Sequence, residues 1–99
     1  MPKTNGLPFP ENLCQDIVKR TYLSRKIDTE MVMDALSQMR DDVDPKDILL
    51  LHYQEGKTLA AIGQFYGLTA ERIRQKRNIG LWKLRRIMFP GAPATKGEK

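Results

Sequence analysis

The spacing of apolar residues along the chain predicts an all-helical protein. Apolar side chains recur every three or four residues over residues 10–25 and again over about 29–40, which is the spacing of one helix face. A third apolar run includes three consecutive leucines, Leu49 to Leu51. The sequence lacks the runs of alternating β-branched residues that are typical of strands. We therefore expect an all-α fold with about five helices, the last two of which form a C-terminal helix-turn-helix.

Residues that favour helix ends divide the chain between these apolar runs. Asp28 or Thr29 can accept hydrogen bonds from the free amides of the second helix. Asp44 followed by Pro45 predicts a capping carboxylate and the first helical position of the third helix. Gly56 is expected to end that helix.

The composition fits one small domain with short tails. The chain has 99 residues and a mass of 11.4 kDa, which is room for a single hydrophobic core. Proline, glycine and small polar residues predict a flexible arm over 1–9 and a disordered tail over 90–99, which leaves a single helical domain over 10–89. No apolar run approaches the length of a membrane span, and the N-terminus does not resemble a signal peptide. We therefore expect a cytoplasmic protein.

The chain offers no set of residues for catalysis or metal binding. Cys14 is the single cysteine and His52 the single histidine, so neither an internal disulfide nor a zinc site can form from them. No carboxylate or nucleophile stands at a spacing that would activate His52. We expect no enzyme activity, no metal and no cofactor.

The segment from Leu59 to about Asn78 has the spacing of a helix-turn-helix, which we place within residues 58–88. Gly63 supplies a small residue where the two helices approach most closely, and Gly67 supplies positive φ in the turn. The apolar positions expected to face the core are Ile62, Leu68 and Ile73. The alternative interpretation is a helical hairpin without a role in DNA binding.

Positive charge is concentrated in the second half of the chain. Residues 1–56 carry 7 basic and 10 acidic side chains, whereas residues 57–99 carry 10 basic and 2 acidic ones. Seven of these basic side chains lie within residues 70–86, together with one acidic side chain. A helix capped by Thr69 and running over 70–88 therefore carries most of the charge. This asymmetry favours a polyanion such as nucleic acid as the partner.

One face of this basic helix is apolar and the opposite face is polar, at about 100° per residue. The apolar face holds Ile73, Gly80, Leu84 and Ile87. On the polar face we expect DNA base contacts from Glu71, Gln75 and Asn78. We expect DNA phosphate contacts from Lys57, Thr58, Thr69, Arg72, Arg74, Lys76 and Arg77. Two interpretations stay open for Trp82, in the core or on a contact surface, and for Arg85 and Arg86, on DNA or on a solvated face.

The string LTAERIRQ over 68–75, followed by LWKLR over 81–85, resembles region 4 of bacterial RNA polymerase sigma factors. The resemblance covers about residues 29–87. It implies a helix-turn-helix of the winged-helix-like DNA-binding class that recognises the −35 promoter element.

The resemblance also implies roles for individual residues. The matched positions are Glu71 and Gln75 for −35 bases, and Arg72 and Arg74 for the DNA backbone. Ala70 stands where primary sigma factors usually have a base-contacting arginine, and Lys76 where they usually have an aliphatic residue. Both departures bear on the preferred DNA sequence. Around Leu49 to Leu51, the resemblance implies an apolar groove that receives the tip helix of the RNA polymerase β flap.

We predict a sequence-specific DNA-binding transcription regulator that binds double-stranded, promoter-like DNA as a monomer rather than a dimer, and that also contacts RNA polymerase. A sigma factor needs a region 2, which would nearly fill 99 residues, so we expect a stand-alone region 4-like protein encoded by a bacterium, a phage or a mobile element. The helix over 10–25 is expected to extend the core, over the third helix or over Trp82. The alternative function is a polymerase-binding or partner-sequestering module that keeps this shape without reading DNA. The polar outer face of the basic helix disfavours a membrane surface.

Overall fold

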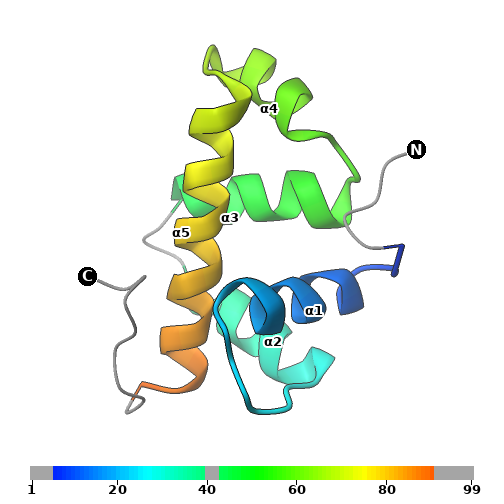
Figure 1. Cartoon of the computed structure of the whole chain (residues 1–99), viewed down its shortest axis with the longest axis vertical. Helices are drawn as coiled ribbons and strands as arrows, with labels where there is room; N and C mark the ends of the chain where they lie inside the picture. Colours follow the sequence, from blue (N-terminus) through cyan, green and yellow to red (C-terminus); the bar gives the residue numbers. More distant parts are fainter. Residues whose placement is uncertain (1–5, 40–42, 91–99) are drawn as a thin grey trace.

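The structure is a computed structural model that describes residues 6–39 and 43–90, and all of its regular elements are helices (Figure 1). In chain order they are α1 (Glu11–Arg20), α2 (Thr29–Ser37), α3 (Val43–Leu49), the π-helical turn η1 (Leu50–Gln54) that continues α3, α4 (Leu59–Tyr66) and α5 (Ala70–Met88). No strand occurs in the two described ranges. The predicted all-α fold with five helices and a C-terminal helix-turn-helix is confirmed.

The longest helix, α5, organises the arrangement of the others. It stands along the long axis of the molecule, and α1, α2, α3 and α4 all contact it (Figure 1). A large apolar cluster joins α1 and α2 to the second half of α5. A small cluster of Ile48, Ile62 and Ile73 joins α3 and α4 to its first half. The helix-turn-helix therefore lies at one end of the molecule and the two N-terminal helices at the other.

The N-terminal helix α1 is part of the core. Leu13 and Ile17 are fully buried in the large cluster. Two buried hydrogen bonds tie α1 to η1: Asn12 Nδ2 donates to the carbonyl oxygen of Tyr53 at 3.0 Å, and Tyr53 Oη donates to Asp16 Oδ2 at 2.7 Å. The expectation that this helix extends the core is confirmed: it packs mainly on α5 and α2, and it contacts the third helix through η1. Phe9 also packs against the cluster, so the last residue of the predicted arm contacts the domain.

The first helix ends earlier than predicted, at Arg20 rather than near residue 25. The hydroxyl of Thr21 donates to the carbonyl of Ile17 at 2.6 Å, and Tyr22 adopts a positive φ of 55°. These two residues turn the chain back, which places Leu23 in the core.

The starts of α2 and α3 differ in how well their caps were predicted. Asp28 Oδ1 accepts a hydrogen bond from the amide of Met31 at 2.9 Å, so Asp28 caps α2 as one of the two expected residues. The last residue of the predicted 29–40 helix lies outside the described residues. The prediction that Asp44 caps the third helix is wrong, because α3 begins at Val43 and Asp44 lies in its first turn. A carboxylate there still favours the positive end of the helix dipole.

The third helix widens into the π-helical turn η1, which the sequence did not indicate. The amide of Glu55 donates to the carbonyl of Leu50, five residues earlier, at 3.0 Å. Leu49 and Tyr53 are buried, whereas Leu50 and Leu51 are only half-buried. Gly56, at a φ of 77°, follows the turn, in agreement with the predicted end of this helix.

Candidate nucleic-acid interface

Two capped helices and a tight turn form the helix-turn-helix. Thr58 Oγ1 accepts from the amide of Ala61 at 3.0 Å at the start of α4, and Thr69 Oγ1 accepts from the amide of Arg72 at 3.1 Å at the start of α5. Gly67 ends α4 in the left-handed conformation, at a φ of 73°. These ends are the predicted ones, and they fix where α5 begins relative to α4.

The closest approach in the motif is between Gly63 and the backbone of the turn. A Cβ on Gly63 would lie 2.5 Å from the carbonyl oxygen of Leu68 and 3.3 Å from backbone atoms of Thr69. The small residue is therefore required here, as predicted. The prediction that Leu68 faces the core is wrong: its backbone, not its side chain, meets Gly63, and the residue is 38% exposed. Ile48 from α3 completes the small core instead.

The long helix α5 divides into a buried and an exposed face as expected. Ile73, Gly80 and Leu84 are buried, Ile87 is half-buried, and Leu81 adds a further buried position. The exposed face in the first two turns carries Glu71, Arg72, Arg74 and Gln75. The structure thus brings together two predicted base contacts and two predicted phosphate contacts on one accessible surface.

These four side chains pair with one another. Arg74 Nε donates to Glu71 Oε1 at 3.1 Å, and Arg74 Nη2 donates to Glu71 Oε2. Arg72 Nη1 donates to Gln75 Oε1 at 3.3 Å. The hydrogen bond from Arg74 lowers the pKa of Glu71, so Glu71 is ionised at neutral pH. Arg72 occupies one of the two lone pairs of Gln75 Oε1, so this atom can still accept a second hydrogen bond.

Arg77 is the exception among the predicted phosphate contacts. Only 3% of the residue is exposed, and its Nε donates to Asn78 Oδ1 at 3.0 Å. Burial lowers the pKa of its guanidinium, and the neighbouring Tyr53 opposes that shift. The assignment of Arg77 to a phosphate contact is therefore wrong, because the helix turns this side chain toward the interior. Asn78, a predicted base contact, is half-buried at the edge of the polar face.

The remaining predicted contacts lie around this surface. Lys57, Thr58 and Thr69 are exposed at the starts of the two helices, and Lys76 is half-buried. Farther along α5, the guanidinium carbon of Arg85 lies 5.3 Å from the centre of the Trp82 ring, and both residues are half-buried. Neither interpretation of Trp82 is fully met, because the ring lies partly in the core and partly beside a cation. Arg86 is exposed.

A shallow depression lies between η1 and α4, on residues outside the predicted DNA contacts. It has a volume of about 330 Å³ and is lined by Asp47, Leu50, Leu51, Gln54, Glu55, Phe65 and Tyr66. Phe65 is 76% exposed, which is unusual for a large aromatic side chain. The half-buried leucines of η1 therefore contribute to an accessible apolar surface with acidic neighbours.

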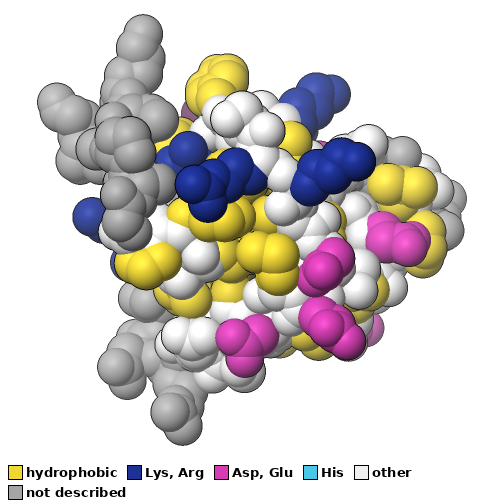
Figure 2. Space-filling model, turned by 90° about the horizontal axis from the view of Figure 1, so that it is seen from below, with side chains coloured by type: hydrophobic (Ala, Val, Ile, Leu, Met, Phe, Trp, Pro, Cys, Tyr) yellow, Lys and Arg dark blue, Asp and Glu magenta, His cyan; other side chains and the backbone are white. Residues whose placement is uncertain are grey.

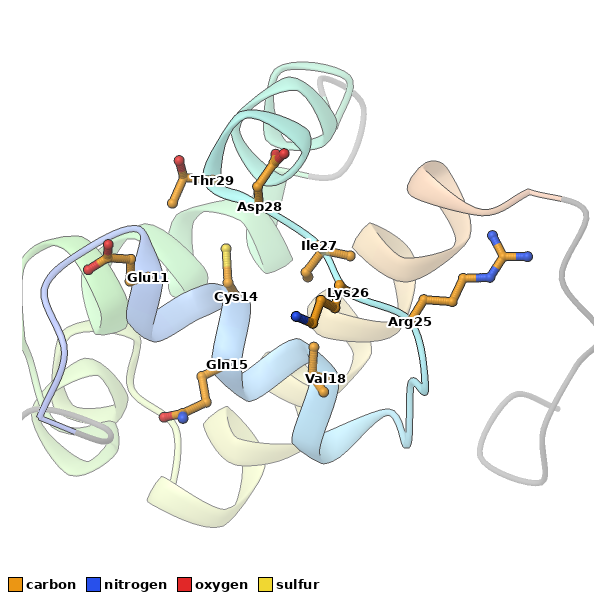
Figure 3. A pocket seen from close by; sticks show the side chains of 9 residues that line it. All are labelled: Glu11, Cys14, Gln15, Val18, Arg25, Lys26, Ile27, Asp28 and Thr29. Carbon is orange, nitrogen blue, oxygen red and sulfur yellow. The ribbon is translucent and has the colours of Figure 1, made fainter.

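The opposite end of the molecule carries a different surface. Seen from below, apolar side chains occupy the middle of this face, with basic side chains on one side and acidic ones on another (Figure 2). An open groove of about 580 Å³ lies between α1 and the segment 25–29, with Cys14, Val18 and Ile27 among its apolar lining (Figure 3). Burial raises the pKa of the Cys14 thiol, so it is protonated at neutral pH.

Within residues 6–39 and 43–90, no helix is both long and apolar enough to cross a membrane. In the same ranges, His, Cys, Asp and Glu side chains form no group of three that could hold a metal ion.

The arrangement of α4, the turn and α5 defines the class of this region, a helix-turn-helix domain. A comparison with known families agrees: residues 44–86 match the family model of sigma-70, region 4. This segment is a sigma region 4-like domain. The match begins in α3, so α1 and α2 lie outside it although they share its core. Neither the curated proteins nor the solved structures contain a match to the chain.

Proposed function

We propose that the protein is a sequence-specific DNA-binding transcription regulator that places the first turns of α5 in the major groove. The observation that carries this proposal is the exposed polar and basic face of a capped helix, set at a fixed angle by the contact at Gly63. Gln75 is suited to adenine and Glu71 to the amino group of cytosine. The protein acts by binding, without catalysis, in the cytoplasm of a bacterium or as a phage or mobile-element product.

Phosphate contacts are assigned to the basic and hydroxyl side chains around that face. Arg72 and Arg74 flank the base-reading residues, and Lys57 and Thr58 stand at the start of α4. The starts of both helices also carry partial positive charge, which favours phosphate. Thr58 and Thr69 accept backbone hydrogen bonds through Oγ1, so each hydroxyl keeps its proton to donate.

The test is selection of bound duplexes from a random pool, followed by titrations on the selected and on scrambled DNA. With about five or six phosphates contacted, log affinity should fall against log salt with a slope of about −5. Gln75→Ala should reduce the preference for the selected duplex, whereas Arg74→Ala should weaken binding to both duplexes by a similar factor. No binding to any duplex refutes the proposal. Equal losses on both duplexes for both variants refute the assigned roles.

We also propose that the depression at η1 and α4 contacts RNA polymerase, through the tip helix of the β flap. The exposed ring of Phe65 beside the half-buried Leu50 and Leu51 supports this assignment. Phe65→Ala should reduce capture of a purified flap segment, and Tyr22→Ala is the matched control, since Tyr22 is another aromatic residue with 77% exposure. Equal capture by both variants contradicts the assignment.

The same surface supports a second candidate function, a polymerase-binding or partner-sequestering module that does not read DNA. The exposed Phe65 favours it, whereas the basic face of α5 is not required by it. Flap capture together with no shift of any selected duplex would decide for this alternative.

A further inference from the structure

One residue on the accessible side of α5 does not fit a polar, solvated face. Ile79 is 51% exposed and belongs to neither apolar cluster. Among the large hydrophobic side chains of the described α5, Ile79 is the one that is exposed. A β-branched residue on a solvated helix face also stabilises the helix less than lysine, glutamate or alanine would. Its side chain therefore contributes little to the fold.

The position of Ile79 places it with the proposed base-reading residues. It follows Gln75 by four residues, so the two side chains lie about 40° apart around the helix and about 6 Å apart along it. The buried Leu84 lies about 140° away by the same geometry. Arg72, Gln75 and Ile79 stand at positions i, i+3 and i+7, a spacing with which a helix in the major groove presents side chains to successive base pairs.

The chemistry of an isoleucine limits what it can read there. Its side chain has no hydrogen-bond donor or acceptor, so it cannot recognise the polar edge of a base. The C5-methyl group of thymine is the apolar group that the major groove offers. From this match we infer that Ile79 is a specificity-determining residue that contacts the methyl group of a thymine, within about two base pairs of the pair read by Gln75. The inference rests on the proposed function.

The experiment replaces each thymine of the selected duplex, one at a time, by deoxyuridine, which differs only by the missing methyl group. The wild-type protein should bind about fourfold more weakly when the contacted thymine is replaced, as expected from one buried methyl group. Ile79→Ala should lose a similar factor on the thymine duplex and should no longer distinguish thymine from deoxyuridine at that position. Met33→Ala, which truncates another exposed apolar side chain, on α2, is the matched control, and it should keep both the affinity and the thymine preference.

Three outcomes overturn the inference. The wild type could bind the selected duplex with no sensitivity to deoxyuridine at any position. Ile79→Ala could retain the full thymine preference, or it could lose affinity equally for both duplexes, as expected for a sugar or phosphate contact. Thermal unfolding of Ile79→Ala checks that the variant is folded, because truncation of an exposed side chain should change the midpoint little. Absence of binding to every duplex is a different result, which overturns the proposed function and this inference with it.

Discussion

Replacement of Gly63 by alanine places a methyl group where the backbone leaves no room for it. The new Cβ would lie 2.5 Å from the carbonyl oxygen of Leu68, and Cβ atoms essentially never approach another heavy atom within 3.0 Å. The turn would have to move by at least about 0.5 Å. The same carbonyl belongs to a residue whose amide donates to Gly63 O at 2.7 Å, so the shift strains that hydrogen bond as well.

Opposing terms set the size of the effect. Alanine favours the helix over glycine by about 1 kcal/mol. Overpacking against atoms that cannot rotate away costs about 1–3 kcal/mol, and a weakened hydrogen bond costs about 1 kcal/mol more. We expect Gly63→Ala to lower the free energy of unfolding by about 1–3 kcal/mol, which for a domain of this size lowers the melting temperature by roughly 4–8 °C per kcal/mol.

Gly80→Ala is the matched control for this prediction. Gly80 is also inside a helix, but its Cβ would lie near side-chain atoms instead of backbone, at 3.0 Å from Leu49 Cδ1, 3.1 Å from Leu49 Cγ and 3.4 Å from Pro45 Cβ. We expect the helix preference of about 1 kcal/mol to offset at least part of that crowding, so this variant should lose less unfolding free energy than Gly63→Ala. Urea unfolding followed by circular dichroism compares the two variants. If Gly63→Ala is as stable as Gly80→Ala, the close approach in the turn does not exist as described.

Further predictions concern the core and the caps. Arg77→Gln should leave the salt slope of DNA binding unchanged, whereas Arg72→Ala should make it shallower by about 0.9, the value for one phosphate; equal slopes for the two variants would contradict the buried placement of Arg77. Burial and the nearby Asp16 raise the pKa of Tyr53, so its phenol holds its proton more tightly in the folded state than in the unfolded state. The free energy of unfolding is therefore unaffected by this group below about pH 10, and it falls as the pH rises above that value. In urea unfolding at several pH values, wild type should therefore lose up to about 1.4 kcal/mol per pH unit more than Tyr53→Phe above pH 10, and identical pH slopes would contradict the sign. Thr69→Ala removes the cap of α5 and should cost about 1 kcal/mol of unfolding free energy, measured by thermal melting, while an unchanged melting temperature would show that the cap contributes nothing.

The helix-turn-helix could be predicted from the sequence because its determinants are local. Thr58, Gly67 and Thr69 act within one turn of their own positions, so residue type and spacing were sufficient to place α4 and the start of α5. The end of α1 could not be predicted in this way. It depends on the positive φ of Tyr22. A glycine in a sequence indicates that a left-handed conformation is possible, whereas a tyrosine does not.

The burial of Arg77 depends on partners far along the chain. At about 100° per residue, Arg77 lies close to the buried positions of α5, and this angle was the available signal. The prediction that Arg77 contacts phosphate relied on its charge and not on this angle. The decisive neighbours come from elsewhere: Tyr53 of η1 and Asp16 of α1 both influence its pKa. The exposure of Ile79 was not predicted. At about 100° per residue it lies about 140° from the buried Leu84, which was a signal for exposure, but an isoleucine is usually assigned to the core by residue type.

Under the proposed function, the pairs that Glu71 forms with Arg74 and Arg72 forms with Gln75 would compete with DNA for the same side chains. These pairs are exposed, so each contributes little free energy and is released at low cost. Where a base or a phosphate replaces an internal partner, only the difference between the two interactions would contribute to affinity. Discrimination between DNA sequences would then depend partly on interactions within the protein.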